Sequence, residues 1–182
     1  MRHVPNALTI LRLLSVPVTV WLMAAGELAA AFWLFAAAGF TDALDGAIAR
    51  MFDAHSRLGQ WLDPLADKVM LVSVYVALGV AGHIPLWLVV LVVLRDVVIV
   101  LYAVVYVLAG AFSGSPLFIS KINTAAQIVL AGVVLAHLGL GWGGIMLTEA
   151  FVYVVALTTS ASGAAYLIAA NRQVPPVDGG DA

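Results

Sequence analysis

Six long apolar stretches follow one another along the chain, and short polar or glycine-containing turns separate them. The stretches lie near residues 7–25, 28–51, 57–81, 85–109, 118–139 and 147–169. Each has about the 20 residues that a helix needs to cross the hydrocarbon core of a membrane. The pattern therefore predicts an all-α integral membrane protein with six transmembrane helices.

The composition agrees with this pattern. Of the 182 residues, 64% are hydrophobic and 10% are charged, whereas an ordinary soluble domain has about 25% charged residues. We expect a single transmembrane domain over residues 1–170 and a disordered cytoplasmic tail over 171–182. The chain has no cysteine, which excludes disulfides and zinc held by cysteines, and no basic run that would indicate a nucleic-acid partner.

Basic residues gather at one set of segment ends and so indicate the orientation of the chain. They are Arg2, Arg12, Arg50, Arg57, Lys121 and Arg172. The turns at the opposite ends, near 26–27, 82–84 and 140–146, contain no lysine or arginine. Both termini should therefore face the cytoplasm, or the matrix in a mitochondrion. Asn6 is a candidate N-cap of the first segment, whose opening turns allow a short interfacial helix.

Four carboxylates stand at helical spacings in the second and third segments. Asp42 and Asp45 are three residues apart, and Asp63 and Asp67 are four apart, so each pair shares one helix face. A short turn makes the two segments antiparallel neighbours. Charges at membrane depth are costly and usually mark function. Because like charges repel, the simplest way to hold four carboxylates together is a bound divalent cation, Mg²⁺, Mn²⁺ or Ca²⁺, and two ions could share them.

The residues between the carboxylates favour a diphosphate ligand. Gly46 allows a ligand to approach the helix backbone closely, and Ala49 extends that small surface by one turn. Arg50 supplies a guanidinium fork for phosphate oxygens. Two other interpretations of the four carboxylates are a structural ion-pair network and a proton path. The rival class of protein is a metal- or proton-coupled transporter. A transporter should place its acids near the midplane between repeats, whereas these acids cluster toward one face and the chain has no convincing repeat.

The full spacing is D-x2-D-G-x2-A-R-x8-G-x3-D-x3-D. Its eight fixed positions are filled by Asp42, Asp45, Gly46, Ala49, Arg50, Gly59, Asp63 and Asp67. In this the chain resembles the CDP-alcohol phosphatidyltransferase family, and the resemblance covers nearly the whole sequence. It implies the fold of that family, with six transmembrane helices, usually as a homodimer, and a divalent-metal site at the cytoplasmic face. It also implies transfer of a phosphatidyl group from a CDP-linked lipid to an alcohol, with release of CMP.

The resemblance also implies a role for each residue of the motif. Asp42, Asp45 and Asp63 would hold the metal, Mg²⁺ or Mn²⁺, on the donor diphosphate. Asp67 would border the metals and act as the general base on the acceptor hydroxyl. The nucleotide pocket would be lined by Gly46, Ala49, Arg50 and Gly59. Asn6 is a further candidate for contact with the donor phosphates.

Polar residues in the last three segments are candidates for binding the acceptor alcohol. Arg95 and Asp96 lie well inside the fourth segment, either as an ion pair or with Arg95 gripping an acceptor phosphate. The fifth segment begins with Lys121 and a polar stripe that includes Asn123, which could either join helices or hold the acceptor. Hydroxyl residues of the sixth segment are expected to hydrogen-bond between or within helices; they are Thr158, Thr159, Ser160 and Ser162.

The acceptor is not identified by the motif. The segments PNALTILR, DPLADK and LTTSASGAAYL look like those of the branch that makes cardiolipin from CDP-diacylglycerol in mitochondria and some bacteria. We therefore expect phosphatidylglycerol as acceptor, in a bacterial or mitochondrial inner membrane. The first alternative is glycerol 3-phosphate, which would give phosphatidylglycerophosphate, followed by inositol phosphate, serine or another alcohol. The small number of cations near the site favours a lipid acceptor over a water-soluble phosphate ester.

Overall fold

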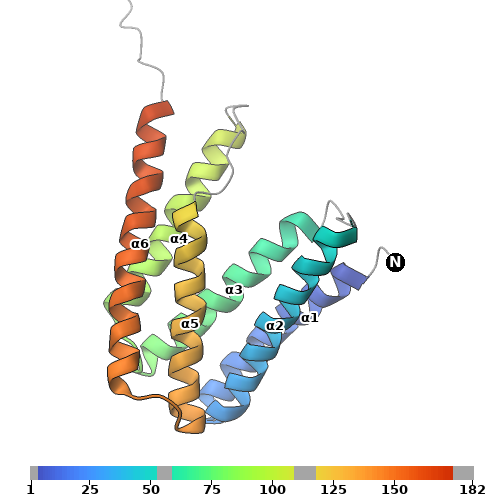
Figure 1. The fold of residues 1–182 in the computed structure, drawn as a ribbon, viewed down its shortest axis with the longest axis vertical. Coiled ribbons are helices and arrows are strands. Elements are labelled where there is room, and N and C mark those ends of the chain that lie inside the picture. Colours follow the sequence, from blue (N-terminus) through green and yellow to red (C-terminus); the bar gives the residue numbers. More distant parts are fainter. Residues whose placement is uncertain (1–3, 53–58, 109–117, 174–182) are drawn as a thin grey trace, which may run out of the picture.

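The computed structural model describes residues 4–52, 59–108 and 118–173, and these form six helices (Figure 1). Their bounds are α1 Val4–Ala24, α2 Leu28–Phe52, α3 Gly59–Val80, α4 Leu86–Leu108, α5 Phe118–Leu140 and α6 Ile145–Gln173. The six apolar stretches of the sequence therefore correspond to six helices, with ends that agree within a few residues. The connections at 53–58 and 109–117 and the predicted tail from 174 onward lie outside the described residues.

Two details at the chain ends differ from expectation. The prediction that Asn6 caps the first helix is wrong, because α1 already begins at Val4. Pro5 fits the first turn, where a backbone N–H would have no acceptor within the helix. The N-terminal residues form no separate interfacial helix within the described part of the chain, since α1 continues unbroken to Ala24. At the other end, α6 continues to Gln173, a few residues past the expected domain boundary.

Glycines close two of the turns at the end of the bundle opposite the motif. Gly26 has a φ of 81° and Gly82 a φ of 78°, a backbone conformation that glycine adopts without steric cost. After Gly82, the His83 amide donates to the Leu78 carbonyl at 2.9 Å, which gives a donor to one of the carbonyls at the C-terminal end of the helix. The same arrangement follows Gly26. Both turns therefore end one helix and reverse the chain within a few residues.

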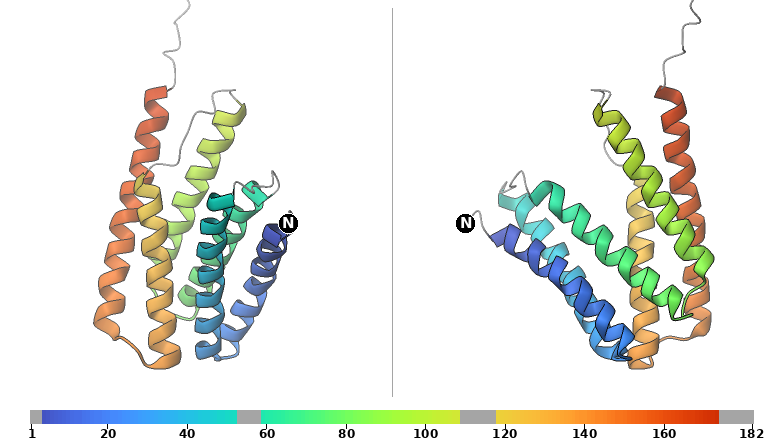
Figure 2. Two further views of the ribbon diagram at one scale, coloured as in Figure 1. Left: turned by 45° about the vertical axis from the view of Figure 1, so that its right-hand side comes forward. Right: turned by 180° about the vertical axis from the view of Figure 1, so that it is seen from behind.

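The helices do not pack simply in chain order (Figures 1 and 2). Helix α1 contacts both α2 and α3, and α5 contacts α2, α3 and α6. Helix α4 packs on α6 and α3. Although α2 and α3 run in opposite directions, no packing contact joins them among the described residues. Both helices contact α1 and α5.

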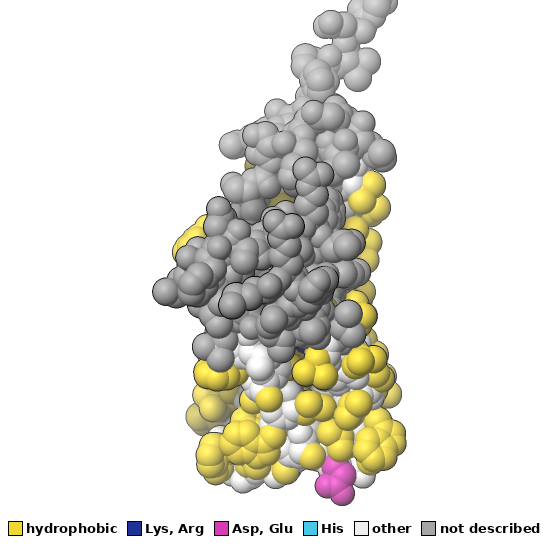
Figure 3. Space-filling model, turned by 90° about the vertical axis from the view of Figure 1, so that its right-hand side faces the viewer, with side chains coloured by type: hydrophobic (Ala, Val, Ile, Leu, Met, Phe, Trp, Pro, Cys, Tyr) yellow, Lys and Arg dark blue, Asp and Glu magenta, His cyan; other side chains and the backbone are white. Residues whose placement is uncertain are grey.

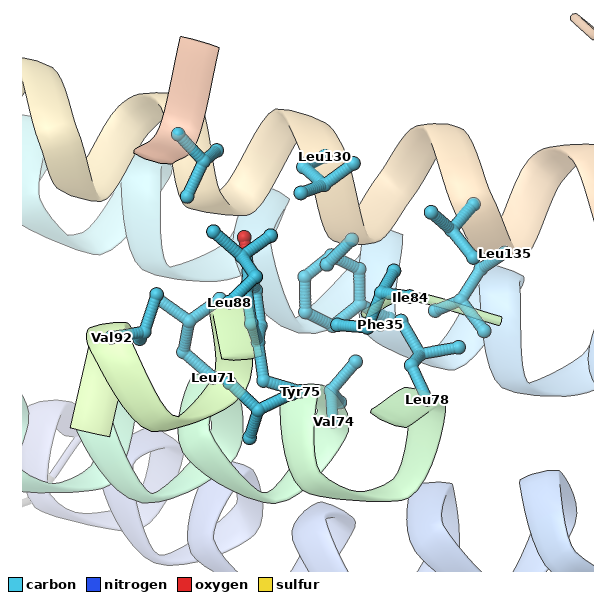
Figure 4. Close-up of a cluster of buried hydrophobic side chains, with 14 of the residues drawn as sticks. Phe35, Leu71, Val74, Tyr75, Leu78, Ile84, Leu88, Val92, Leu130 and Leu135 are labelled. Carbon is cyan, nitrogen blue, oxygen red and sulfur yellow. The ribbon is translucent and has the colours of Figure 1, made fainter. Parts of the chain in front are cut away.

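A buried apolar cluster joins α3 to α4, α5 and α2 (Figure 4). Its largest fully buried side chains include Tyr75 and Leu78 of α3, Leu88 of α4 and Leu130 of α5. The Tyr75 hydroxyl donates a hydrogen bond of 3.1 Å to the backbone carbonyl of Gln127, so its polar end is satisfied inside the core. This cluster fixes α3 against α5 below the residues of the motif.

The outer surface of the bundle is strongly apolar. Large side chains such as Trp21, Leu157 and Met146 are 65%, 72% and 84% exposed, and hydrophobic groups cover much of the described part of the face in Figure 3. Among the described residues, Phe118–Leu140 and Ile145–Ala169 are long and apolar enough to cross a membrane. Apolar surface of this extent marks contact with a membrane or with other protein.

Candidate active site

The predicted motif is divided between two helices at one end of the bundle. Helix α2 carries Asp42, Asp45, Gly46, Ala49 and Arg50 near its C-terminus. Helix α3 begins with Gly59 and carries Asp63 and Asp67. The start of α1, with Asn6, lies at the same end (Figure 1). Of these side chains only that of Asp67 belongs to the described residues, so the convergence of the four carboxylates stays a prediction.

Asp67 is held by an arginine from another helix. The Arg12 Nη1 of α1 donates to the Asp67 Oδ1 at 2.8 Å. The Arg12 side chain is 6% exposed, whereas that of Asp67 is 43% exposed. The guanidinium therefore reaches the carboxylate from inside the bundle and leaves the carboxylate partly accessible. Arg12 was not among the predicted site residues, although a charge within an apolar segment was a signal that could have indicated it.

A second ion-pair network begins at the residue next to Asp67. Lys68 Nζ lies 2.8 Å from Asp96 Oδ1 of α4, and Arg95 Nη1 lies 2.7 Å from the same oxygen. The Lys68 side chain is 37% exposed, while Arg95 is 4% and Asp96 13% exposed. One carboxylate oxygen therefore receives two cationic donors, and the contact from Lys68 links α3 to α4.

The Arg95 guanidinium extends this network to the last two helices. Its Nη2 donates to Ser120 Oγ of α5 at 2.7 Å and to Ser162 Oγ of α6 at 2.7 Å, and its Nε also donates to Ser162 at 3.1 Å. With the contact to Asp96, all three nitrogens of the guanidinium have partners. Arg95 of α4 therefore joins α5 and α6 directly, and the Lys68–Asp96 contact connects α3 to the same network.

The polar stripe of α5 is buried against α6. Asn123 is fully buried, and its Oδ1 accepts hydrogen bonds from Thr158 at 2.9 Å and Thr159 at 2.8 Å. These contacts and that of Ser162 confirm the expected hydrogen bonding of Thr158, Thr159 and Ser162, while for the exposed Ser160 it stays a prediction. The Asn123 Nδ2 and the Gln127 Nε2 have no hydrogen-bond partner within the described part of the chain. Lys121, on another side of α5, is exposed.

The charges around Asp67 form an alternating series across three helices. It consists of Arg12 on α1, Asp67 and Lys68 on α3, and Asp96 and Arg95 on α4. Three cations face two carboxylates within this series. Such pairing reduces the cost of placing charges among apolar helices.

The donor atoms of the motif suit a hard divalent cation. Carboxylate oxygens are the ligands that Mg²⁺ and Mn²⁺ prefer, and the partly exposed Asp67 carboxylate is one such donor. Helical backbone at Asp42 and Asp45, and at Asp63 and Asp67, places each pair one turn apart on its helix. The residues present therefore fit a divalent metal site.

Comparison with known proteins identifies the family. The model of the CDP-alcohol phosphatidyltransferase family matches residues 2–174. The chain is 38% identical over 184 residues to a cardiolipin synthase (CMP-forming) / mitochondrial hydrolase fusion protein of Schizosaccharomyces pombe, a match that covers 92% of the chain and 31% of that relative. It is 34% identical over 194 residues to the cardiolipin synthase (CMP-forming) of Rattus norvegicus, covering 97% of the chain and 64% of the relative.

The human cardiolipin synthase (CMP-forming) is 36% identical over 181 residues, covering 90% of the chain and 60% of that protein. The chain thus spans less than two thirds of the length of each of these curated relatives. The family match, by contrast, extends over almost all of the chain and includes both helices of the motif. The chain belongs to the CDP-alcohol phosphatidyltransferase family.

Proposed function

We propose that this protein transfers the phosphatidyl group of CDP-diacylglycerol to phosphatidylglycerol, forming cardiolipin and CMP. The observation that carries the proposal is the position of Asp67. This carboxylate is partly exposed, is oriented by Arg12, and lies at the end of the bundle where α2 and α3 carry the remaining residues of the motif. The similarity to cardiolipin synthases over 90% or more of the chain supports phosphatidylglycerol as the acceptor.

In this reaction the acceptor hydroxyl oxygen forms a bond to the phosphorus of the phosphatidyl group, and the bond from that phosphorus to the CMP oxygen breaks. Asp67 takes the proton of the acceptor hydroxyl as general base. Arg12 holds one oxygen of Asp67, so that the carboxylate keeps one orientation toward the substrate. Because a carboxylate beside cations is a weak base, the orientation of Asp67 contributes more than its basicity.

The metal site would be formed by Asp42, Asp45, Asp63 and Asp67. We propose that two ions, Mg²⁺ or Mn²⁺, bind there. They would neutralise the charge on the diphosphate and on the CMP leaving group. On the protein side, Gly46, Ala49, Arg50 and Gly59 line the nucleotide pocket, with Arg50 on phosphate oxygens. Asn6 is placed on the first turns of α1 at the same end and is proposed as a donor contact.

The acceptor-side residues receive two different roles. Arg95 and Asn123 have internal partners on neighbouring helices, and we infer that they position α4, α5 and α6 around the acceptor. Arg95 is paired with Asp96 on its own helix and hydrogen-bonded to serines of α5 and α6, which favours the ion-pair interpretation of Arg95 over the gripping of an acceptor phosphate. Lys121 is exposed near the start of α5 and is proposed to attract the anionic acceptor to the site.

The site is proposed to lie in an inner membrane, bacterial or mitochondrial, with all six helices spanning it. The apolar outer surface and the internal pairing of Arg12, Lys68, Arg95 and Asp96 support this arrangement, since unpaired charges are costly at membrane depth. The positive-inside pattern supports a cytoplasmic or matrix side for the termini and the site. We further propose that the protein acts as a homodimer.

The test is a comparison of acceptors with purified protein. CDP-diacylglycerol and Mg²⁺ or Mn²⁺ are supplied with phosphatidylglycerol, glycerol 3-phosphate, inositol phosphate or serine, and the lipid products are separated. We expect cardiolipin and an equal amount of CMP with phosphatidylglycerol, and none after exhaustive chelation. Phosphatidylglycerophosphate as the main product would replace the proposed acceptor. Absence of CMP release with every alcohol would contradict an enzyme and favour the transporter class.

A further inference from the structure

An apolar track follows the outer face of α3, beginning beside Lys68. One cavity of about 420 Å³ lies between α3 and α4, and a second of about 560 Å³ lies between α3 and α1. Val72 and Ser73 line both cavities, so the two adjoin at the middle of α3. The view from behind in Figure 2 shows α3 between α1 and α4 along this face.

The track has one charged end and is otherwise lined mainly by apolar side chains. Lys68 and Asp96 are the charged groups of its lining, while His83 lies at its far end near the α3–α4 turn. From Lys68 to Val80, where α3 ends, the helix advances about 18 Å. This is more than half of the roughly 30 Å hydrocarbon core of a membrane. The dimensions and lining therefore suit an extended hydrocarbon chain.

The charge at the polar end suits a phosphate with a single negative charge. Lys68 has three N–H donors, and among the described residues only Asp96 accepts from it. Asp96 is also held by Arg95, so it keeps a cationic partner if Lys68 turns toward a ligand. The group of Lys68, Arg95 and Asp96 has two cations and one carboxylate, an excess of one positive charge that one phosphodiester group would neutralise.

We propose that this track binds the acceptor phospholipid, with its phosphodiester at Lys68 and one acyl chain along α3 toward Val76 and Val80. The assignment rests on the proposed function, because it places a lipid acceptor beside Asp67, the residue next to Lys68. Asp67 and Lys68 are neighbours in α3 but face α1 and α4 respectively, so the head group of a lipid held at Lys68 would extend across α3 to reach Asp67. The acyl chain then points away from the charged end, and the head group of the same lipid faces the motif.

The first test maps the lipid directly. Phosphatidylglycerol with a photoreactive diazirine near the end of one acyl chain is added to the purified protein, irradiated, and the labelled peptides are identified by mass spectrometry. We expect the label on α3 beyond Ser73 and on the facing part of α1. The assignment is overturned if the label is found mainly on α2, α5 or α6. Conversion of the same probe to cardiolipin, measured in parallel, shows separately whether the proposed function holds.

Substitutions at the charged end test the phosphate contact. Lys68→Gln should lower labelling by the phosphatidylglycerol probe at least fivefold, and Lys68→Arg should retain most of it because the cation is kept. A diacylglycerol probe with the same diazirine should label both variants equally, since it has no phosphate. Equal labelling of Lys68→Gln and the unaltered protein by phosphatidylglycerol would overturn the contact.

A matched pair of valines tests the track. Val76 lines the cavity beside α1 and is 41% exposed, while Val154 on α6 is 43% exposed and outside both cavities. Val76→Trp should raise the KM for phosphatidylglycerol about tenfold and leave that for CDP-diacylglycerol within twofold. Val154→Trp should change neither. Equal effects of the two variants would contradict an acyl-chain site along α3.

A second copy of the chain is the other occupant that such a surface could take. The protein has no cysteine, so single Val76→Cys and Val97→Cys variants report on their own surroundings. If the track holds lipid, oxidation should give no disulfide between two copies. Rapid disulfide formation at either position, together with loss of the photolabel, would assign the track to a dimer interface and overturn the proposal.

Discussion

The Arg12 guanidinium of α1 lies 2.8 Å from the Asp67 carboxylate of α3, although 55 residues separate them in the chain. Arg12 is buried and Asp67 is partly exposed, so the contact joins the inside of the bundle to the end that carries the motif. Lys68 makes the corresponding contact on the other side of α3, with Asp96 of α4. Helix α3 is thus fixed on both sides at the residue proposed as the general base.

The first prediction concerns Asp67 itself. Asp67→Asn keeps the size of the side chain but removes the proton acceptor, so transfer should be lost while binding of CDP-diacylglycerol largely remains. Glu149→Gln, an exposed carboxyl at the start of α6, is the matched control and should leave transfer unchanged. The measurements are CMP release and equilibrium binding of the donor. Turnover retained by Asp67→Asn would contradict the assignment of the base.

The second prediction separates orientation of Asp67 from its chemistry. Arg12→Lys keeps the positive charge but replaces a rigid guanidinium fork with a flexible ammonium, so the carboxylate should lose its fixed orientation. We expect kcat to fall by about 10- to 100-fold, with the KM for the donor changed less than threefold. Steady-state kinetics with varied CDP-diacylglycerol give both values. A variant with unchanged kcat would show that Arg12 does not position Asp67.

The third prediction concerns the Arg95 network. Ser162→Ala removes an acceptor that receives hydrogen bonds from both Nε and Nη2 of the buried Arg95. The expected loss of stability is about 0.5–2 kcal/mol, because a buried donor is left without its partner but helices in lipid find substitutes. Thermal unfolding in detergent micelles measures the change. Ser160→Ala, an exposed serine on the same helix, should have no effect, and an equal loss there would refute the assignment.

The fourth prediction uses two glycines of α5. A Cβ atom at Gly139 would lie 2.5 Å from the backbone nitrogen of Ala29, at the start of α2, whereas one at Gly132 meets nothing within 4 Å. Gly139→Ala should therefore destabilise the protein by about 1–3 kcal/mol, since backbone cannot move aside cheaply. Gly132→Ala should be neutral or stabilise it by up to about 1 kcal/mol. Unfolding midpoints that rank the two variants in the opposite order would show that α5 and α2 do not approach closely.

The helices could be predicted from the sequence because each is a long apolar run ended by glycine or polar turn residues. The start of α1 was misplaced because Asn6 and Pro5 together resemble a cap, while Pro5 equally fits a first helical turn. Pairings between helices could not be predicted in the same way. Helical periodicity shows that Asp63 and Asp67 share a face, but it does not identify the helix that they meet.

The networks around α3 illustrate this limit. Arg95 and Asp96 are neighbours in the chain, so their ion pair was among the interpretations of the sequence. The contacts of Arg12 with Asp67 and of Lys68 with Asp96 depend on how α1 and α4 pack against α3. Both contacts arise from tertiary packing, which brings together charges from separate apolar segments. The local sequence pattern does not predict which of these charges meet.

The most direct test of the central claim is a crystal structure of the protein with CDP-diacylglycerol and Mn²⁺, using the anomalous scattering of manganese to locate the ions. The claim predicts two Mn²⁺ ions about 3.5–4 Å apart between α2 and α3, each bound by carboxylates of both helices, with Asp67 bordering them. Manganese located elsewhere, or carboxylates on α2 and α3 too far apart to share an ion, would contradict it.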